Sequence, residues 1–218
     1  EVGLGKTIEA CLVLHSCLQS LRFKNALIIV PKSLSHQWMI ELYRKFSMGV
    51  RLINEQTRID EDFNWESEKV TLVSLELLVQ HPDYQDAILS REWDMAIFDE
   101  AHRLRWNNGD PNREYQLGER VSNLVKGMIL LTASPEKAGG ENHFGRLKLV
   151  DPDRFSDYAS YQKSAKKYLS VASAMSVFEE DEKKGWDVPE LSTRLEMHPG
   201  ILEPFVRVAL KEGRIAVD

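Results

Sequence analysis

The sequence begins with EVGLGKTIEA (residues 1–10), in which glycines lead into a lysine and a threonine. Because glycine has no Cβ, backbone N–H groups there can approach phosphate oxygens closely. Lys6 would place a positive charge on the β- and γ-phosphates, and Thr7 would offer a hydroxyl ligand to Mg²⁺. The following segment, 6–21, lacks Gly and Pro and predicts a helix whose positive dipole end faces the anion. We therefore predict a nucleotide-binding loop made by Gly3, Leu4, Gly5, Lys6, Thr7 and Ile8.

Short apolar runs alternate with helical segments along the first two thirds of the chain. The runs predict strands at 25–30, 69–74, 93–98 and 127–132. Helices are expected at 33–46, 75–80 and 112–125, with Ser33 or Ser35 as a possible cap of the first of these. This order predicts an α/β fold whose parallel sheet is covered by helices on both faces.

No strand pattern follows residue 141. Helices are expected at 141–150 and 156–178, then a charged break at 179–185 and two short helices. We expect one domain over 1–150 and a helical extension over 151–218.

Composition sets broad limits. The net charge of −6 argues against a uniformly basic nucleic-acid coat, although it allows a local basic groove. Cys11 and Cys17 are the only cysteines and have no metal-binding spacing, so two reduced thiols are expected. No apolar run reaches the length of a membrane span, and the composition is typical of a soluble intracellular protein.

The stretch IFDEAH (97–102) places two adjacent carboxylates at the end of an apolar strand. Beside a phosphate loop, Asp99 would hold the Mg²⁺ of the nucleotide and Glu100 would polarise the attacking water, with Lys6 completing the catalytic set. The ordinary alternative is a pair of solvated acids at a strand end. A third stretch, LLTASP (130–135), would bring the hydroxyls of Thr132 and Ser134 to the same edge, but it is a weak motif alone.

Taken in order, EVGLGKT, DEAH and LTASP resemble motifs I, II and III of superfamily 2 helicase-like ATPases, in their Swi/Snf branch. The finer resemblance is to the first motor lobe of the bacterial members that associate with RNA polymerase, over about residues 1–165. It is carried by LIIVPKSLSHQW, EWDMAIFDEAHRL, REYQ, LLTASPE and HFGRLKLVDPDRF. Two details depart: Ser134 stands where threonine is commoner, and Arg103 follows the DEAH box without an interpretation from sequence.

The resemblance implies a RecA-like P-loop lobe of an ATP-driven motor, with ATP and Mg²⁺ as cofactors, that moves along double-stranded DNA without separating its strands. RNA polymerase is the implied protein partner, and a bacterial, cytoplasmic and nucleoid-associated location the implied setting, with no membrane partner. By position, Lys32, Ser33, Gln37 and Ser74 would contact the DNA backbone, with Trp38 mainly packing in the core. His102 would relay between the ATP site and Thr132 and Ser134, or could be a satisfied core group.

Motors of this type close the ATP site between two lobes, and the second lobe supplies arginines. We expect the chain to be a fragment that lacks the strand before the loop, holds one lobe, and begins a helical insertion. The second RecA-like lobe is expected in the same full-length chain, so this fragment alone should hydrolyse ATP barely above background.

Two other interpretations stay open from the sequence. A DEAH-box RNA helicase shares the DEAH string but usually has GSGKT and SAT where this sequence has GLGKT and TASP. A non-catalytic module could keep the fold for partner binding alone, but Lys6, Thr7, Asp99 and Glu100 are all present.

Overall fold

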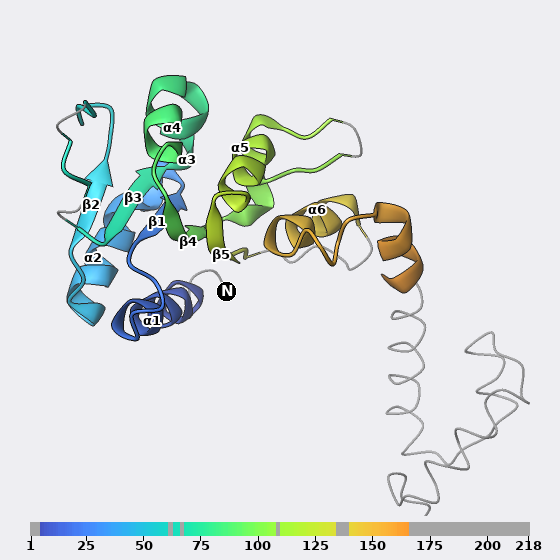
Figure 1. The fold of residues 1–218 in the computed structure, drawn as a ribbon, viewed down its shortest axis with the longest axis horizontal. Helices are drawn as coiled ribbons and strands as arrows, with labels where there is room; N and C mark the ends of the chain where they lie inside the picture. The colour runs from blue at the N-terminus through green and yellow to red at the C-terminus, as the bar shows by residue number, and fades with distance from the viewer. Residues whose placement is uncertain (1–4, 61–62, 66–67, 108–109, 134–139, 166–218) are drawn as a thin grey trace, which may run out of the picture. The chain divides into compact units, whose positions relative to one another are not determined.

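The computed structural model describes residues 5–60, 63–65, 68–107, 110–133 and 140–165. Its centre is a parallel five-stranded sheet of order β2-β3-β1-β4-β5 (Figure 1). The strands are β1 (Ala26–Val30), β2 (Val50–Ile53), β3 (Val70–Ser74), β4 (Trp93–Phe98) and β5 (Val125–Leu130). In the central register Ile28 of β1 lies between Leu72 of β3 and Ile97 of β4. The predicted parallel α/β fold is confirmed.

Helices cover both faces of this sheet. The helices are α1 (Lys6–Gln19), α2 (Ser35–Phe46), α3 (Leu75–Gln80), α4 (Pro82–Leu89), α5 (Arg113–Ser122) and α6 (Glu141–Val150). Figure 1 shows α1 and α2 on one side of the strands and α3, α4 and α5 on the other. Two single 3-10 turns, η1 (Lys32–Leu34) and η3 (Ala101–Arg103), follow β1 and β4.

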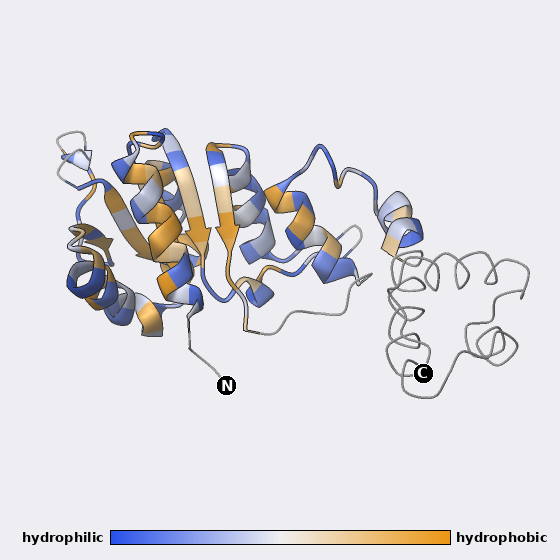
Figure 2. Cartoon of the chain, turned by 90° about the horizontal axis from the view of Figure 1, so that it is seen from below, coloured by the Kyte–Doolittle hydropathy of each residue, from blue (hydrophilic) through white to orange (hydrophobic). Residues whose placement is uncertain are grey.

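The alternation of side chains along the strands explains the two layers. In β1, Ile28 faces the apolar cluster that includes Leu14 of α1 and Leu42 of α2, whereas Leu27 faces the cluster that includes Leu78 of α3. Successive strand residues point to opposite faces, so a strand that is apolar throughout must be covered twice. All five residues of β1 are buried, and Figure 2 shows the apolar strands between amphipathic helices.

The structure differs from the sequence prediction at several elements. It adds the edge strand β2 and the helix α4, and it places β5 at Val125–Leu130, starting two residues before the predicted 127–132. The predicted cap is wrong, because the turn η1 leads directly into α2, whose N-cap position is Leu34 without a side-chain cap bond. Ser33 and Ser35 therefore lie within the helical turns.

The chain divides into two compact units, residues 1–158 and 159–218. The first unit holds the sheet and its helices. In the second, residues 159–165 are helical, and residues 166–218 of the predicted extension lie outside the described residues. Within the described part of the chain, no helix is both long and apolar enough to cross a membrane.

Candidate functional site

The predicted site residues gather at the carboxyl edge of the sheet. Asp99 and Glu100 directly follow β4, and Thr132 lies two residues after β5. Lys32 follows β1 by two residues, and Ser74 is the last residue of β3. Ligands of open parallel sheets bind beyond this edge, so the structure brings together segments far apart in the sequence.

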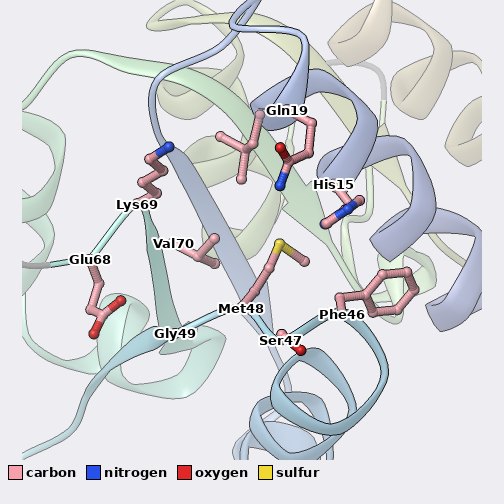
Figure 3. A pocket seen from close by; sticks show the side chains of 10 residues that line it. His15, Gln19, Phe46, Ser47, Met48, Gly49, Glu68, Lys69 and Val70 are labelled. Carbon is pink, nitrogen blue, oxygen red and sulfur yellow. The ribbon is translucent and has the colours of Figure 1, made fainter.

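The direction of α1 places Lys6 and Thr7 at the same edge. The end of α1 lines a cavity of about 390 Å³, where His15 and Gln19 lie beside Met48 and Val70 at the amino ends of β2 and β3 (Figure 3). Because a helix of 14 residues spans about 21 Å, the first turn of α1 must lie toward the opposite, carboxyl edge. The cavity in Figure 3 is therefore remote from the acidic pair and is not the predicted nucleotide site.

The start of α1 has the backbone that a phosphate loop requires. Gly5 occupies the N-cap position with φ 117°, a conformation that glycine adopts readily and L-residues rarely do. Its carbonyl accepts the first helical hydrogen bond, from the N–H of Glu9 at 2.8 Å. Lys6, Thr7 and Ile8 form the first turn and are half-buried. Because the N–H groups of a first turn have no partner within the helix, they and the positive helix end can bind an anion. Gly3 and Leu4 lie outside the described residues.

Both oxygens of the Asp99 carboxylate accept a hydrogen bond from this chain. The backbone N–H of Glu100 donates to Oδ1 at 2.8 Å, and the indole Nε1–H of Trp38 donates to Oδ2 at 2.7 Å. The backbone N–H of Asp99 in turn donates to the carbonyl of Ile29 at 2.9 Å, which joins the ends of β1 and β4. Trp38 was expected to pack in the core, which it does, but its contact with Asp99 was missed. No local sequence signal connects two residues 61 positions apart.

Glu100 has a strained backbone and an unusual side-chain environment. Its backbone is left-handed (φ 52°, ψ 45°), which costs a non-glycine residue on the order of 1 kcal/mol and is frequent at active sites. Its Oε2 atom is buried and accepts no hydrogen bond from the part of the chain that the structure describes. His102 Nδ1 lies 3.0 Å from Oε2, but the pair does not have the directional geometry of a hydrogen bond. A buried carboxylate oxygen without a donor is costly unless a water or ligand supplies one.

The turn after β4 is also joined to the end of β5. The N–H of Ala101 donates to the carbonyl of Leu131 at 2.7 Å, and the N–H of Leu131 donates to the carbonyl of Phe98 at 2.8 Å. Thr132 therefore follows a residue bonded to the acidic turn. His102 is not a core group, because its side chain is 44% exposed. Ser134 lies outside the described residues.

Arg103, which had no interpretation from sequence, forms an ion pair across the strand ends. Its Nη1 lies 2.6 Å from Oε1 of Glu76, in the first turn of α3. The other Glu76 oxygen, Oε2, accepts the backbone N–H of Lys32 at 2.9 Å. Partial burial of Glu76 raises its pKa, but the hydrogen bonds from Arg103 and from backbone N–H groups outweigh burial and lower the pKa below its usual value. The segments after β1, β3 and β4 are thus joined through one carboxylate.

Three of the four predicted nucleic-acid residues are exposed. Lys32, Ser33 and Gln37 reach solvent around η1 and the start of α2. The Lys32 ammonium is paired with Glu55 Oε1 at 2.5 Å, and this hydrogen bond lowers the pKa of Glu55. Ser74 is different, because it is 7% exposed and its hydroxyl accepts the N–H of Leu77 as the N-cap of α3. Its place in the fold supports positioning of α3 rather than direct contact.

The SNF2-related domain family matches residues 1–195 of the chain. The chain belongs to this family. It is 38% identical over 222 residues to the RNA polymerase-associated protein RapA of Erwinia tasmaniensis, covering 99% of this chain and 23% of that protein. It is 44% identical over 177 residues to RapA of Pseudomonas fluorescens, covering 80% of this chain and 19% of that protein. The expected resemblance to the bacterial Swi/Snf branch is confirmed, and the chain spans about a fifth of the length of these relatives.

Solved structures agree on the fold. The Sulfolobus solfataricus SWI2/SNF2 ATPase core in complex with dsDNA has a TM-score of 0.60 at 20% identity, covering 90% of this chain and 37% of that one. The Pyrococcus furiosus Hef helicase domain has a TM-score of 0.53 at 21% identity, covering 68% of this chain and 32% of that one. These likenesses place the sheet and its helices in the RecA-like fold of such ATPase cores.

The donor set fits a magnesium nucleotide better than a metal held by protein alone. Among the described residues, no group of three or more His, Cys, Asp or Glu side chains could hold a metal ion. Mg²⁺ typically takes one or two carboxylates and completes its shell with water and substrate phosphates. One carboxylate at Asp99 and one hydroxyl at Thr7, at the edge where the first turn of α1 can bind phosphate, match that pattern.

Proposed function

We propose that this chain is the ATP-binding lobe of a DNA-dependent ATPase of the RapA type, which in the full-length protein translocates on double-stranded DNA. The observation that supports the proposal most is the buried Oε2 of Glu100, which accepts no hydrogen bond from the described residues and lies beside Asp99, at the edge to which α1 directs Lys6 and Thr7. An attacking water would supply the donor that this oxygen lacks.

In the proposed mechanism, the N–H groups at the start of α1 and the Lys6 ammonium bind the triphosphate. Asp99 and Thr7 would hold Mg²⁺, which when bound would offset the negative charge of the phosphates. Glu100 accepts a proton from the attacking water and orients it toward the γ-phosphate. Arginines from a second RecA-like lobe would stabilise the developing charge, which is why we propose that this lobe alone has little activity.

The decisive experiment measures ATP hydrolysis by the full-length protein carrying Glu100→Gln. Removing the general base should lower kcat by about 10²–10⁴ while ATP binding persists. Glu68→Gln is a matched control, because Glu68 lines the cavity at the opposite edge of the sheet. Hydrolysis by Glu100→Gln at the wild-type rate would exclude the proposed role of Glu100 and favour a non-catalytic module.

Duplex DNA is the proposed nucleic-acid partner, bound through its backbone by Lys32, Ser33 and Gln37. Phosphate contacts carry no sequence information but make binding salt-dependent. Lys32→Ala should therefore weaken DNA binding and make the negative slope of log K against log salt shallower by about 0.9. Glu55→Gln should strengthen binding modestly, because the exposed ion pair with Lys32 no longer competes with phosphate. Stimulation of the ATPase by single-stranded RNA and not by duplex DNA would instead support an RNA helicase.

The names of the RapA relatives support RNA polymerase as the protein partner and a bacterial cytoplasmic location. Co-sedimentation of the full-length protein with purified RNA polymerase tests this partner. If the two proteins sediment as separate species at micromolar concentration, RNA polymerase would not be supported as the partner.

A further inference from the structure

The contact between Trp38 and Asp99 has the features of a device that positions a metal ligand. Trp38 is 1% exposed, and its ring packs in the cluster between α1, α2 and the sheet. Its one polar atom, Nε1, nevertheless reaches the edge of the sheet and donates to Asp99 Oδ2 at 2.7 Å. An indole N–H can only donate, so it fixes an acceptor in one orientation.

Packing alone does not require this arrangement. Trp93 is buried to a similar extent, at 2% exposed, and its Nε1–H is satisfied by the backbone carbonyl of Ile88 at 2.8 Å. The fold can therefore satisfy a buried indole without an ionisable partner. At position 38 the partner is the strand-end carboxylate, although a charged acceptor is costly to bring to a buried ring.

The two hydrogen bonds on Asp99 define its rotamer. Oδ1 is held by the N–H of the next residue, Glu100, and Oδ2 by an indole from another helix. Among the described residues each oxygen accepts one hydrogen bond, and since a carboxylate oxygen has two lone-pair directions, the second can accept a cation or its bound water. Partners of this kind orient metal ligands, and their loss typically costs about 10–100-fold in metal affinity or activity.

We propose that Trp38 is a positioning residue for the magnesium nucleotide, and that its indole N–H holds the Asp99 carboxylate in the orientation that binds the metal. The proposal rests on the proposed function, because it needs the metal at Asp99. It adds that α2, which begins next to the Lys32–Leu34 turn, supplies a direct hydrogen bond to the metal ligand.

The test uses Trp38→Phe in the full-length protein, since phenylalanine keeps an aromatic ring in the core and removes only the donor and part of the ring. Trp93→Phe is the matched control, because it deletes an equally buried indole bond away from the site. The readout is binding rather than turnover: Mn²⁺, which replaces Mg²⁺ as a paramagnetic probe, is titrated by electron paramagnetic resonance with a non-hydrolysable ATP analogue present. Nucleotide binding in EDTA is measured in parallel.

We expect the half-saturating Mn²⁺ concentration to rise about 10–100-fold in Trp38→Phe and to stay unchanged in Trp93→Phe. Nucleotide binding in EDTA should be equal in all three proteins, because the donor acts only on the metal ligand. Asp99→Asn should weaken Mn²⁺ binding in the wild-type background, and adding Trp38→Phe to it should have little further effect.

Three outcomes would overturn the proposal. If Asp99→Asn weakens Mn²⁺ binding but Trp38→Phe and Trp93→Phe have the same half-saturating Mn²⁺ concentration, the indole has no positioning role and the proposed function stands. If Trp38→Phe weakens nucleotide binding equally in EDTA, its effect is structural. If Asp99→Asn leaves Mn²⁺ binding unchanged, the metal is not at Asp99 and the proposed function fails as well.

Discussion

The ion pair between Arg103 and Glu76 gives a prediction about what holds the strand ends together. Replacing Arg103 by methionine keeps the aliphatic stem and removes the guanidinium. Glu76 then retains the N–H of Lys32 on Oε2 but loses the donor 2.6 Å from Oε1. A carboxylate that loses a charged partner while still partly buried destabilises the folded state.

The magnitude follows from burial. The side chains of Arg103 and Glu76 are 32% and 30% exposed, so the pair lies between the solvated and the fully buried case. Exposed pairs are worth roughly 0.2–1 kcal/mol, and breaking buried ones costs about 3–5 kcal/mol. After allowance for solvent screening, we expect Arg103→Met to lower the free energy of unfolding by about 1–2 kcal/mol. Glu76→Gln should lower the free energy of unfolding by a similar amount, and the double variant should be little less stable than either single variant.

Urea unfolding monitored by circular dichroism measures these differences, and the double-mutant cycle isolates the pair. The control pair is Arg120 and Asp86, which are 3.0 Å apart with side chains 50% and 70% exposed. Its coupling energy should stay below about 0.5 kcal/mol. Equal coupling energies for the two pairs would refute the reasoning, because burial would then make no difference.

Three further predictions concern stability and reactivity. A hydrogen bond from Lys126 lowers the pKa of Asp94 in the folded protein. The stability that Asp94 contributes is therefore fully present above the ordinary carboxyl pKa and is lost as the pH falls through the lowered pKa. When the free energy of unfolding is measured against pH, it should decrease less steeply in acid for Asp94→Asn than for the wild type. A Cβ on Gly145 would clash with the Trp106 Cβ, so Gly145→Ala should lower the free energy of unfolding by about 1–3 kcal/mol, and an unchanged urea midpoint would contradict this. Burial raises the pKa of the Cys11 thiol to about 12, so iodoacetamide at pH 8 should leave it unmodified in the folded protein and react after unfolding, as peptide mass spectrometry would show.

The sequence predicted the central layers because their signal is local. The run of 26–30 is apolar throughout, which is typical of a strand covered on both faces, and β1 is indeed fully buried. The edge strand β2 was missed since its four residues, VRLI, include an arginine and are mostly half-buried. The early start of β5 was missed for a similar reason, because Val125 and Lys126 pair with β4 through contacts that no local pattern reveals.

In the candidate site, too, the features with a local sequence signal were predicted and those without one were not. The sequence motifs indicated which segments matter, since glycine loops and strand-end acids are recognisable within a few residues. The side-chain contacts between motifs were not predictable, because Trp38 and Asp99, or Glu76 and Arg103, meet only through the strand order. Arg103 illustrates the limit: beside the acidic box it had no meaning in sequence, and its partner lies 27 residues earlier on another helix.

Under the proposed function, the strand order places the acidic turn between the segment that would bind DNA and the segment after β5. In the order β3-β1-β4-β5, the segments after β3 and β1 lie on one side of the acidic turn and the segment after β5 on the other. On the first side the turn is joined to Lys32 through Arg103 and Glu76, and on the second to Leu131 through backbone bonds. A shift of this turn on loss of the γ-phosphate would therefore strain both neighbours at once.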